Sequence, residues 1–139
     1  MILADTGFWV ALLNIRDVHH QPALAAFERV KSEPLVATWP VLTESVYLLS
    51  VRASPDTARK FLQSVAQGLC QLRNLDEPAL LRMHTLMGKY RDLPMDLADA
   101  SLVVLAEQLG EGRILSTDTR DFGAYRWKNT KPFSNLMAV

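Results

Sequence analysis

The first fourteen residues, MILADTGFWVALLN (residues 1–14), contain a short apolar run, an acid and a second apolar run. The run ILA is continuous rather than alternating, as expected of a strand buried on both faces of a sheet. From Gly7 to Asn14 the apolar side chains recur at helical spacing. A buried strand that ends at Asp5 and passes into a helix is the start of a βαβ unit and predicts an α/β fold.

The same alternation of strand and helix continues along the chain. Further strands are predicted at 34–38, 70–75, 112–118 and, as a last one, 133–139. Helices are predicted at 21–31, 39–52, 54–68, 76–90 and 93–110, with Ser54 and Asp76 as N-caps and Gly68 and Gly110 as stops. This order predicts a mostly parallel sheet of four to five strands with helices on both faces, a three-layer α/β/α sandwich that forms one domain over residues 1–139.

Composition restricts the class of protein. The chain has 139 residues, of which 49% are hydrophobic. Its 15 basic residues balance its 15 acidic ones, so the net charge does not indicate a strongly basic nucleic-acid-binding protein. The single cysteine, Cys70, allows no internal disulfide and is expected to pack as a small apolar residue. Residues 1–14 lack the basic start of a signal peptide and are too short for a membrane span, so the cytoplasm is the expected compartment.

The stretch LPMDLADASLVVLAEQLG (residues 93–110) opens an otherwise apolar helix with Asp96 and Asp99. Aspartate is a good N-cap, and an acid in the first turn suits the positive end of the helix dipole. Capping therefore explains Asp96 well. A metal site is the alternative explanation of the pair.

Three more acids fall at the same predicted edge of the sheet. Asp5 and Asp118 lie at the carboxyl ends of their strands, and Glu44 lies near the start of the helix that follows strand 34–38. Ligands of open parallel sheets bind at this edge. Capping explains Asp5 poorly, because Thr6 is a sufficient cap for the next helix, and it does not explain Glu44 inside an apolar helix.

Converging carboxylates repel one another unless a cation compensates their charge. Mg²⁺ and Mn²⁺ suit carboxylate and water ligands, keep open positions, generate hydroxide and neutralise a phosphate in reaction. The acids therefore predict hydrolysis of phosphate esters or phosphodiesters with Mg²⁺ (or Mn²⁺) as cofactor.

Four motifs in order complete the pattern: ILADTGFWVALL, TESVYLL, PMDLADASLVVLAEQLG and RILSTDTRDF, which together span residues 2–122. In these motifs the chain resembles the PIN-domain ribonucleases and, among them, the toxins of VapBC-type toxin–antitoxin pairs. The resemblance implies a PIN-like three-layer sandwich, an endoribonuclease that cleaves RNA, a cognate antitoxin partner and a homodimer.

Carried over by residue, the resemblance makes Asp5, Glu44 and Asp99 the core metal-binding and catalytic acids, with Asp118 as the fourth, more variable one. Thr6 and Ser116 match small hydroxyl residues that line such sites. Asp96 matches an additional acid whose role, cap or outer ligand, stays open.

Basic and aromatic residues suggest where RNA is held. Arg52, with Arg59 and Lys60, follows Glu44 along the chain and is a candidate rim for the phosphate backbone. The segment YRWKNTK (residues 125–131) combines Tyr125 and Trp127 with Arg126 and Lys128, a composition that stacks bases and binds phosphates, although a solvated surface explains it equally well. His19 and His20 are expected to be loop or capping residues rather than a catalytic pair.

Other functions compete with a toxin ribonuclease. A housekeeping RNA-processing nuclease would use the same acids. A phosphatase for small esters is disfavoured, because no glycine-rich phosphate cradle and no aspartyl nucleophile motif surround Asp5. A non-enzymatic binding domain would need every acid to be a cap or a solvated charge.

Overall fold

The computed structural model describes residues 1–137 and contains the predicted parallel sheet. Five strands pair in the order β3-β2-β1-β4-β7, and all four pairings are parallel. The strands are β1 (Ile2–Ala4), β2 (Leu35–Thr38), β3 (Gln71–Arg73), β4 (Arg113–Leu115) and β7 (Ser134–Asn135). The prediction of four to five strands is confirmed, while residues 138 and 139 of the predicted last strand lie outside the described residues.

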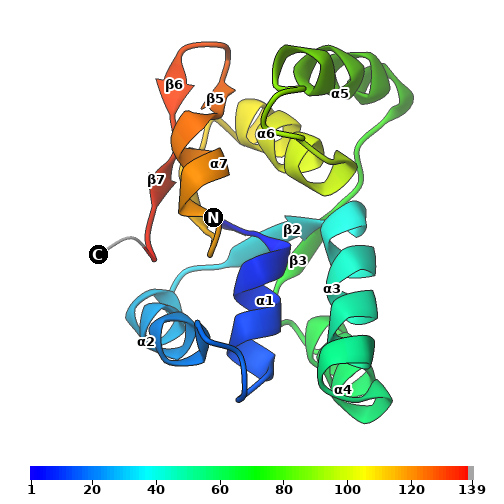
Figure 1. Ribbon diagram of the computed structural model, residues 1–139, viewed down its shortest axis with the longest axis vertical. Coiled ribbons are helices and arrows are strands. Elements are labelled where there is room, and N and C mark those ends of the chain that lie inside the picture. Colours follow the sequence, from blue (N-terminus) through cyan, green and yellow to red (C-terminus); the bar gives the residue numbers. More distant parts are fainter. Residues whose placement is uncertain (138–139) are drawn as a thin grey trace.

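Helices cover both faces of this sheet, as Figure 1 shows. On one side lie α1 (Thr6–Leu13), α2 (His20–Val30), α3 (Trp39–Arg52) and α4 (Pro55–Ala66). On the other lie α5 (Glu77–Lys89), α6 (Leu97–Leu109) and the short α7 (Thr119–Ala124). This arrangement confirms the three-layer α/β/α sandwich.

The central strands are apolar because both of their faces are covered. All three residues of β1 are fully buried, and so are Ile114 and Leu115 of β4. The edge strand β3 instead alternates, with Gln71 and Arg73 exposed. Burial therefore decreases toward this edge, as the position of the strand in the sheet requires.

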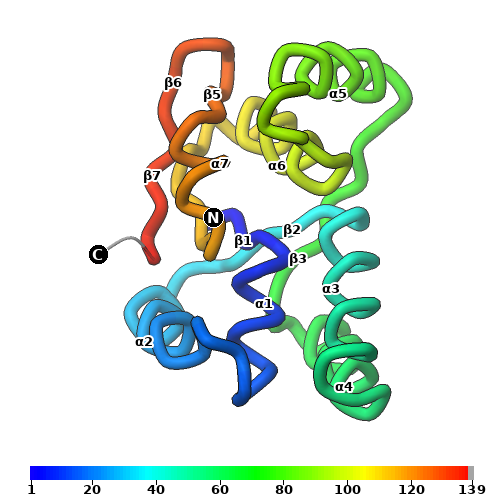
Figure 2. The backbone as a smooth tube through the Cα atoms, in the orientation of Figure 1, coloured from blue at the N-terminus to red at the C-terminus, as the bar shows by residue number. Residues whose placement is uncertain are grey.

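Three elements between β4 and β7 were absent from the sequence prediction. The segment after β4 forms α7, and a two-stranded antiparallel hairpin follows it, made of β5 (Arg126–Trp127) and β6 (Lys131–Pro132). Figure 2 shows the backbone rising through α7 into this hairpin before it returns to the sheet as β7. Strands of two residues carry no alternation that a sequence pattern could reveal.

The described residues share one core on both sides of the sheet, which includes Trp9, Phe61 and Leu105. Cys70 is buried in this core, as predicted, and burial raises the pKa of its thiol to about 11, so it is not a ready nucleophile. None of the helices within residues 1–137 is long and apolar enough to cross a membrane.

Candidate functional site

Asp5 is the most deeply buried acid at the carboxyl edge of the sheet. Its side chain is 5% exposed, and its backbone N–H continues the ladder by donating to the Leu115 carbonyl at 2.9 Å. Its carboxylate accepts one hydrogen bond from the Thr6 backbone N–H at 2.7 Å and another from Ser116 Oγ at 2.9 Å. Asp5 itself is thus the N-cap of α1, and the prediction that Thr6 provides this cap was wrong.

Asp96 and Asp99 meet at the start of α6. Asp96 Oδ1 accepts the Asp99 backbone N–H at 2.8 Å, and Asp99 Oδ2 accepts the Asp96 backbone N–H at 3.4 Å, which together form a capping box. Asp96 is therefore the helix cap. Asp99 has a second partner, because the Tyr125 hydroxyl donates to Asp99 Oδ2 at 3.2 Å.

Glu44 reaches the same edge from the second turn of α3. The start of α3 is fixed beside α6 by a buried hydrogen bond of 2.6 Å between Thr38 Oγ1 and Ser101 Oγ. Thr38 is also the N-cap of α3. A half-buried Glu44 side chain consequently lies where the charges of Asp5 and Asp96 act on it.

The negative charge of each of these acids opposes ionisation of its neighbours. Burial, reinforced by the charges of Glu44 and Asp96, raises the pKa of Asp5 to about 7 even though Ser116 and Thr6 donate to it. Burial and the charges of Asp5 and Asp96 raise the pKa of Asp99 to about 8. Burial, followed by the charge of Asp96, also raises the pKa of Glu44. Such clusters of raised pKa values are typical of functional sites and would be relieved by a cation.

Comparison with known proteins identifies the family of this chain. The family model described as the PIN domain matches residues 2–128. The chain belongs to the PIN domain family. It is 27% identical over 125 residues to the protein named Ribonuclease VapC26 of Mycobacterium tuberculosis (strain ATCC 25618 / H37Rv), covering 90% of this chain and 92% of that relative.

A solved structure supports the same fold. This PIN domain superposes on Mycobacterium tuberculosis VapC20, described as a Sarcin-Ricin loop cleaving toxin, with a TM-score of 0.75. The match has 20% sequence identity and covers 86% of this chain and 92% of the VapC20 chain. The comparisons confirm the resemblance to VapC-like PIN ribonucleases.

Asp118 is placed differently from the other acids of this PIN domain. It is the N-cap of α7, where its Oδ1 accepts the Asp121 backbone N–H at 3.0 Å. Its own N–H donates to Ser116 Oγ at 3.0 Å, the same hydroxyl that donates to Asp5. Ser116 therefore connects Asp118 to Asp5. Asp118 is a helix cap, and its role as the fourth acid stays a prediction.

The Thr6 side chain is buried beside Glu44. Thr6 is 4% exposed, and its hydroxyl lies close enough to Glu44 to lower the pKa of that acid, against the effect of burial. Thr6 therefore lies among the acids, and its role as a hydroxyl that lines the site stays a prediction.

The aromatic residues of segment 125–131 do not offer stacking surfaces. Tyr125 is fully buried, with its ring 5.0 Å from Tyr90 and 5.1 Å from Phe122. Trp127 is 8% exposed, and its Nε1 donates to the Pro132 carbonyl at 3.1 Å. The interpretation of these two rings as base-stacking residues was therefore wrong, since burial leaves no free ring face.

The basic candidates separate into near and distant ones. Arg52 is exposed and close enough to Glu44 to lower the pKa of that acid. The Arg126 guanidinium donates to three carbonyls at the end of α7, those of Gly123, Ala124 and Tyr125. The Lys128 backbone N–H is bound by Glu107, two turns beyond Asp99 along α6. Arg52 is the best placed of the three to bind a phosphate beside the acids.

The histidines lie at the far end of α1 from the acids. His19 is the N-cap residue of α2 and makes no side-chain capping bond, and His20 Nδ1 lies 2.8 Å from the Ala11 carbonyl. These positions agree with the loop and capping roles predicted for the pair.

Sequence reasoning missed two residues that hold the site together. Tyr125 was considered only as a stacking residue, yet it binds Asp99. The Asn135 side chain bridges to Ser116, accepting from its N–H at 3.2 Å and donating to its carbonyl at 2.9 Å. The sequence signal for Asn135 was a polar residue within the otherwise largely apolar run FSNLM.

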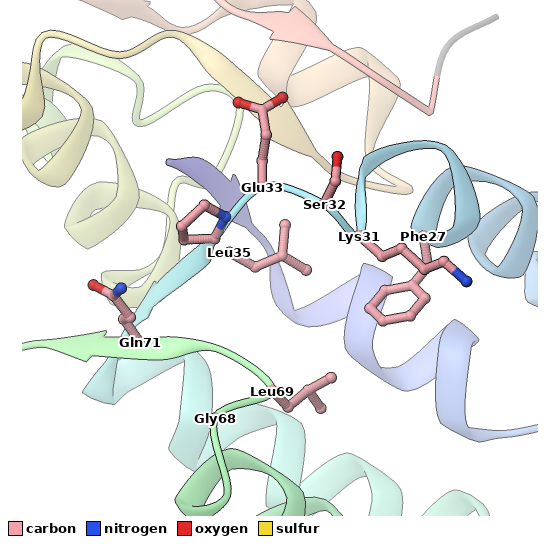
Figure 3. Close-up of a pocket in the computed structure, with 9 residues that line it drawn as sticks. Phe27, Lys31, Ser32, Glu33, Leu35, Gly68, Leu69 and Gln71 are labelled. Carbon is pink, nitrogen blue, oxygen red and sulfur yellow. The ribbon is translucent and has the colours of Figure 1, made fainter.

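Two of the cavities found among the described residues lie at opposite ends of the strands. The cavity in Figure 3, of about 430 Å³, is lined by Phe27, Lys31 and Leu69 among others and adjoins the amino ends of β2 and β3. Glu33 at its margin pairs with Arg113 at 3.0 Å. The other, a groove of about 720 Å³ between α3 and α6, includes Glu44 and Asp96 in its lining. The groove, and not the cavity of Figure 3, adjoins the acids.

The raised pKa values give an expected pH dependence. The folded state binds the Asp5 proton more tightly than the unfolded chain, because the pKa rises from 3.8 to about 7 on folding. The contribution of Asp5 to folding stability is therefore complete below about pH 4 and is lost as the pH rises to about 7. The contribution of Asp99 is lost in the same way, up to about pH 8. We expect the melting temperature in EDTA to fall over this range less steeply for Asp5→Asn than for the wild type. Parallel profiles for the two proteins would contradict the raised pKa of Asp5.

Proposed function

We propose that this PIN domain is a Mg²⁺- or Mn²⁺-dependent endoribonuclease that hydrolyses RNA phosphodiester bonds. The observation that carries the proposal is the cluster of Asp5, Glu44 and Asp99, delivered by three separate elements to one edge of the sheet. Their pKa values are raised, and within residues 1–137 none of the three forms a salt bridge with a basic side chain. The name of the relative Ribonuclease VapC26 supports RNA as the substrate, and the solved neighbour is described as a Sarcin-Ricin loop cleaving toxin.

The donor set suits a hard divalent cation. All candidate ligands are oxygens, and Asp5 and Asp99 would hold the ion, with Glu44 and Asp118 at its margin. Within residues 1–137 no group of three Asp, Glu, His or Cys side chains is arranged to coordinate one metal ion. A Mg²⁺ ion bound by Asp5 and Asp99 would keep several waters, as Mg²⁺ usually does when one or two carboxylates bind it.

The bound ion would lower the pKa of a water and neutralise charge on the phosphate. The residues of the chain fix the two principal carboxylates before the ion arrives. Ser116 and the Thr6 N–H hold Asp5, while Tyr125 and the Asp96 N–H hold Asp99. Arg52, exposed beside Glu44, would bind the substrate phosphate backbone.

The direct test is cleavage of RNA by the purified protein. Structured and single-stranded RNAs are incubated with Mg²⁺, with Mn²⁺ and with EDTA, and the cuts are mapped. We expect internal cuts with either ion and none in EDTA. Equal cleavage in EDTA would refute metal dependence, and no cleavage of any RNA would refute the nuclease.

We further propose that the protein is a toxin, acting in the cytoplasm as a homodimer and neutralised by a cognate antitoxin. The relatives named VapC support this role over a housekeeping nuclease. Expression of the chain alone should arrest growth of a bacterial host, and co-expression of an antitoxin encoded immediately upstream should restore growth. Normal growth with abundant active protein would favour RNA processing instead.

Tyr125 offers a test of how Asp99 is held. Tyr125→Phe removes only the hydroxyl and keeps the ring packing, so the fold should be retained. Loss of a hydrogen bond to a metal ligand costs about 10- to 100-fold in metal affinity, and we expect a weakening of this size for Mn²⁺, measured by titration of the melting temperature. Tyr90→Phe is the matched control, because the Tyr90 hydroxyl binds the Arg126 N–H and none of the acids. Equal Mn²⁺ affinity in the two variants would show that Tyr125 does not position Asp99.

A further inference from the structure

The Asn135 side chain replaces backbone pairing at the outer edge of the sheet, where β7 lies beside β4. Their backbone pairing continues to the Leu136 N–H, which donates to the Ile114 carbonyl at 2.8 Å. A regular parallel ladder would next join the Ser116 N–H to the Leu136 carbonyl. That carbonyl instead accepts Arg29 Nη2 of α2 at 3.0 Å. The backbone of Ser116 therefore takes its partners from the Asn135 side chain.

The amide of Asn135 satisfies both backbone groups of Ser116. Asn135 Oδ1 accepts the Ser116 N–H at 3.2 Å, and Asn135 Nδ2 donates to the Ser116 carbonyl at 2.9 Å. Asn135 Oδ1 also accepts the Met137 N–H at 3.1 Å, which fixes the orientation of the amide. Ser116 is fully buried, so backbone groups without partners would be costly at this position. Asparagine suits the position because its amide carries a donor and an acceptor side by side.

Ser116 in turn binds two of the candidate acids. Its Oγ donates to Asp5 Oδ2 at 2.9 Å and accepts the Asp118 N–H at 3.0 Å. We propose that Asn135 is a positioning residue of the candidate metal site. Through Ser116 it holds Asp5 and Asp118 in place and thereby sets the affinity of the site for a divalent cation. This inference rests on the proposed metal-dependent function.

The alternative is that Asn135 only closes the edge of the sheet, and the two roles predict different results. A purely structural Asn135 would change the melting temperature of the metal-free protein and leave the affinity of the folded protein for a cation unchanged. A positioning residue changes that affinity. Removal of a side chain that holds a metal ligand in place costs about 10- to 100-fold in metal affinity.

The affinity for Mn²⁺ is measured from the melting temperature as a function of Mn²⁺ concentration, starting from EDTA. Ser116 contacts a candidate ligand directly, whereas Asn135 acts through Ser116. We therefore expect Asn135→Ala to bind Mn²⁺ about tenfold more weakly than the wild type, at the lower end of the range for such residues.

Asn14→Ala is the matched control. Asn14 Oδ1 accepts the Arg16 N–H at 3.2 Å, two residues along the chain, as Asn135 Oδ1 does with the Met137 N–H. Asn14 is the C-cap residue of α1, and Asp5 is at the other end of this helix. The control loses a comparable local bond away from the acids, so it should keep the Mn²⁺ affinity of the wild type even if its melting temperature falls.

A double-mutant cycle tests the route through Ser116. Ser116→Ala removes the hydroxyl that binds Asp5 and keeps the backbone groups that bind Asn135. It should weaken Mn²⁺ binding by about 10- to 100-fold. Because Asn135 acts through that hydroxyl, the double variant should bind Mn²⁺ as weakly as Ser116→Ala alone and no more weakly.

Amide hydrogen exchange in EDTA supplies a readout without metal. The Asp118 N–H donates to Ser116 Oγ and not to Asn135, so its exchange rate reports the position of the hydroxyl. We expect about 2- to 10-fold faster exchange in Asn135→Ala, the size of one weakened hydrogen bond. Asn135→Asp keeps both accepted bonds and loses only the donated one. This second variant should fold even where Asn135→Ala does not, and its Asp118 N–H should also exchange faster than in the wild type.

Four outcomes would overturn the inference. Equal Mn²⁺ affinity in Asn135→Ala and Asn14→Ala, with the wild type binding Mn²⁺, refutes the positioning role and leaves the proposed function standing. Additive losses in the cycle show that Asn135 does not act through the Ser116 hydroxyl. Unchanged exchange of the Asp118 N–H in both Asn135 variants shows that the amide does not place that hydroxyl. A wild type that binds no Mn²⁺ removes both the inference and the proposed metal dependence.

Discussion

Asp5→Asn is expected to abolish RNA cleavage while preserving the fold. The substitution removes the negative charge of the most buried carboxylate, and the loss should be about 100-fold or more, the size found when a single electrostatic group of an active site is removed. Asparagine caps helices about as well as aspartate, so the Asp5 Oδ1 bond to the Thr6 N–H can be retained in α1. Initial rates on a labelled RNA with Mn²⁺ measure the effect.

Asp76→Asn is the matched control for this experiment. Asp76 is the N-cap of α5 and accepts the Ala79 backbone N–H at 3.3 Å, so it repeats the capping role of Asp5 without contact with the acid cluster. Its cleavage rate should equal that of the wild type. Cleavage by Asp5→Asn at a rate near that of Asp76→Asn would show that Asp5 is only a cap.

Asp99→Asn is expected to lose most of the stabilisation that Mn²⁺ gives to the wild type. At about a hundred times its dissociation constant, a ligand that binds only the folded state stabilises it by about 2.7 kcal/mol. In EDTA near pH 8 the variant should be no less stable than the wild type, because burial and the charges of Asp5 and Asp96 oppose ionisation of Asp99. Thermal melts with EDTA and with Mn²⁺ measure both quantities.

The capping box supplies the control for Asp99. Asp96 is the N-cap of α6 through its bond to the Asp99 N–H, and asparagine can accept the same bond. Asp96→Asn should therefore keep most of its stability in EDTA and most of the gain from Mn²⁺. If Mn²⁺ raised the melting temperature of Asp99→Asn as much as that of the wild type, Asp99 would not be a ligand.

Local sequence patterns determined most of the architecture of this PIN domain. The continuous apolar runs ILA and LVA predicted strands buried on both faces, and Ser54, Asp76 and Gly110 marked helix ends where the structure has them. These signals are readable because caps and periodic burial depend on residues a few positions apart. The order of strands and helices then placed Asp5 and Asp118 at one edge of a parallel sheet.

Only the tertiary structure decided which side chains hold the acids and which of them are buried. Ser116 donates to Asp5 across 111 residues of chain, and Tyr125 reaches Asp99 from beyond α7. A single hydrogen bond between side chains so far apart leaves no periodic trace in the sequence. The same limit explains why Tyr125 and Trp127 looked like exposed stacking residues while Trp39 is the exposed ring. Exposure depends on what the rest of the chain packs against a ring, and here α6 and the β5–β6 hairpin decide it.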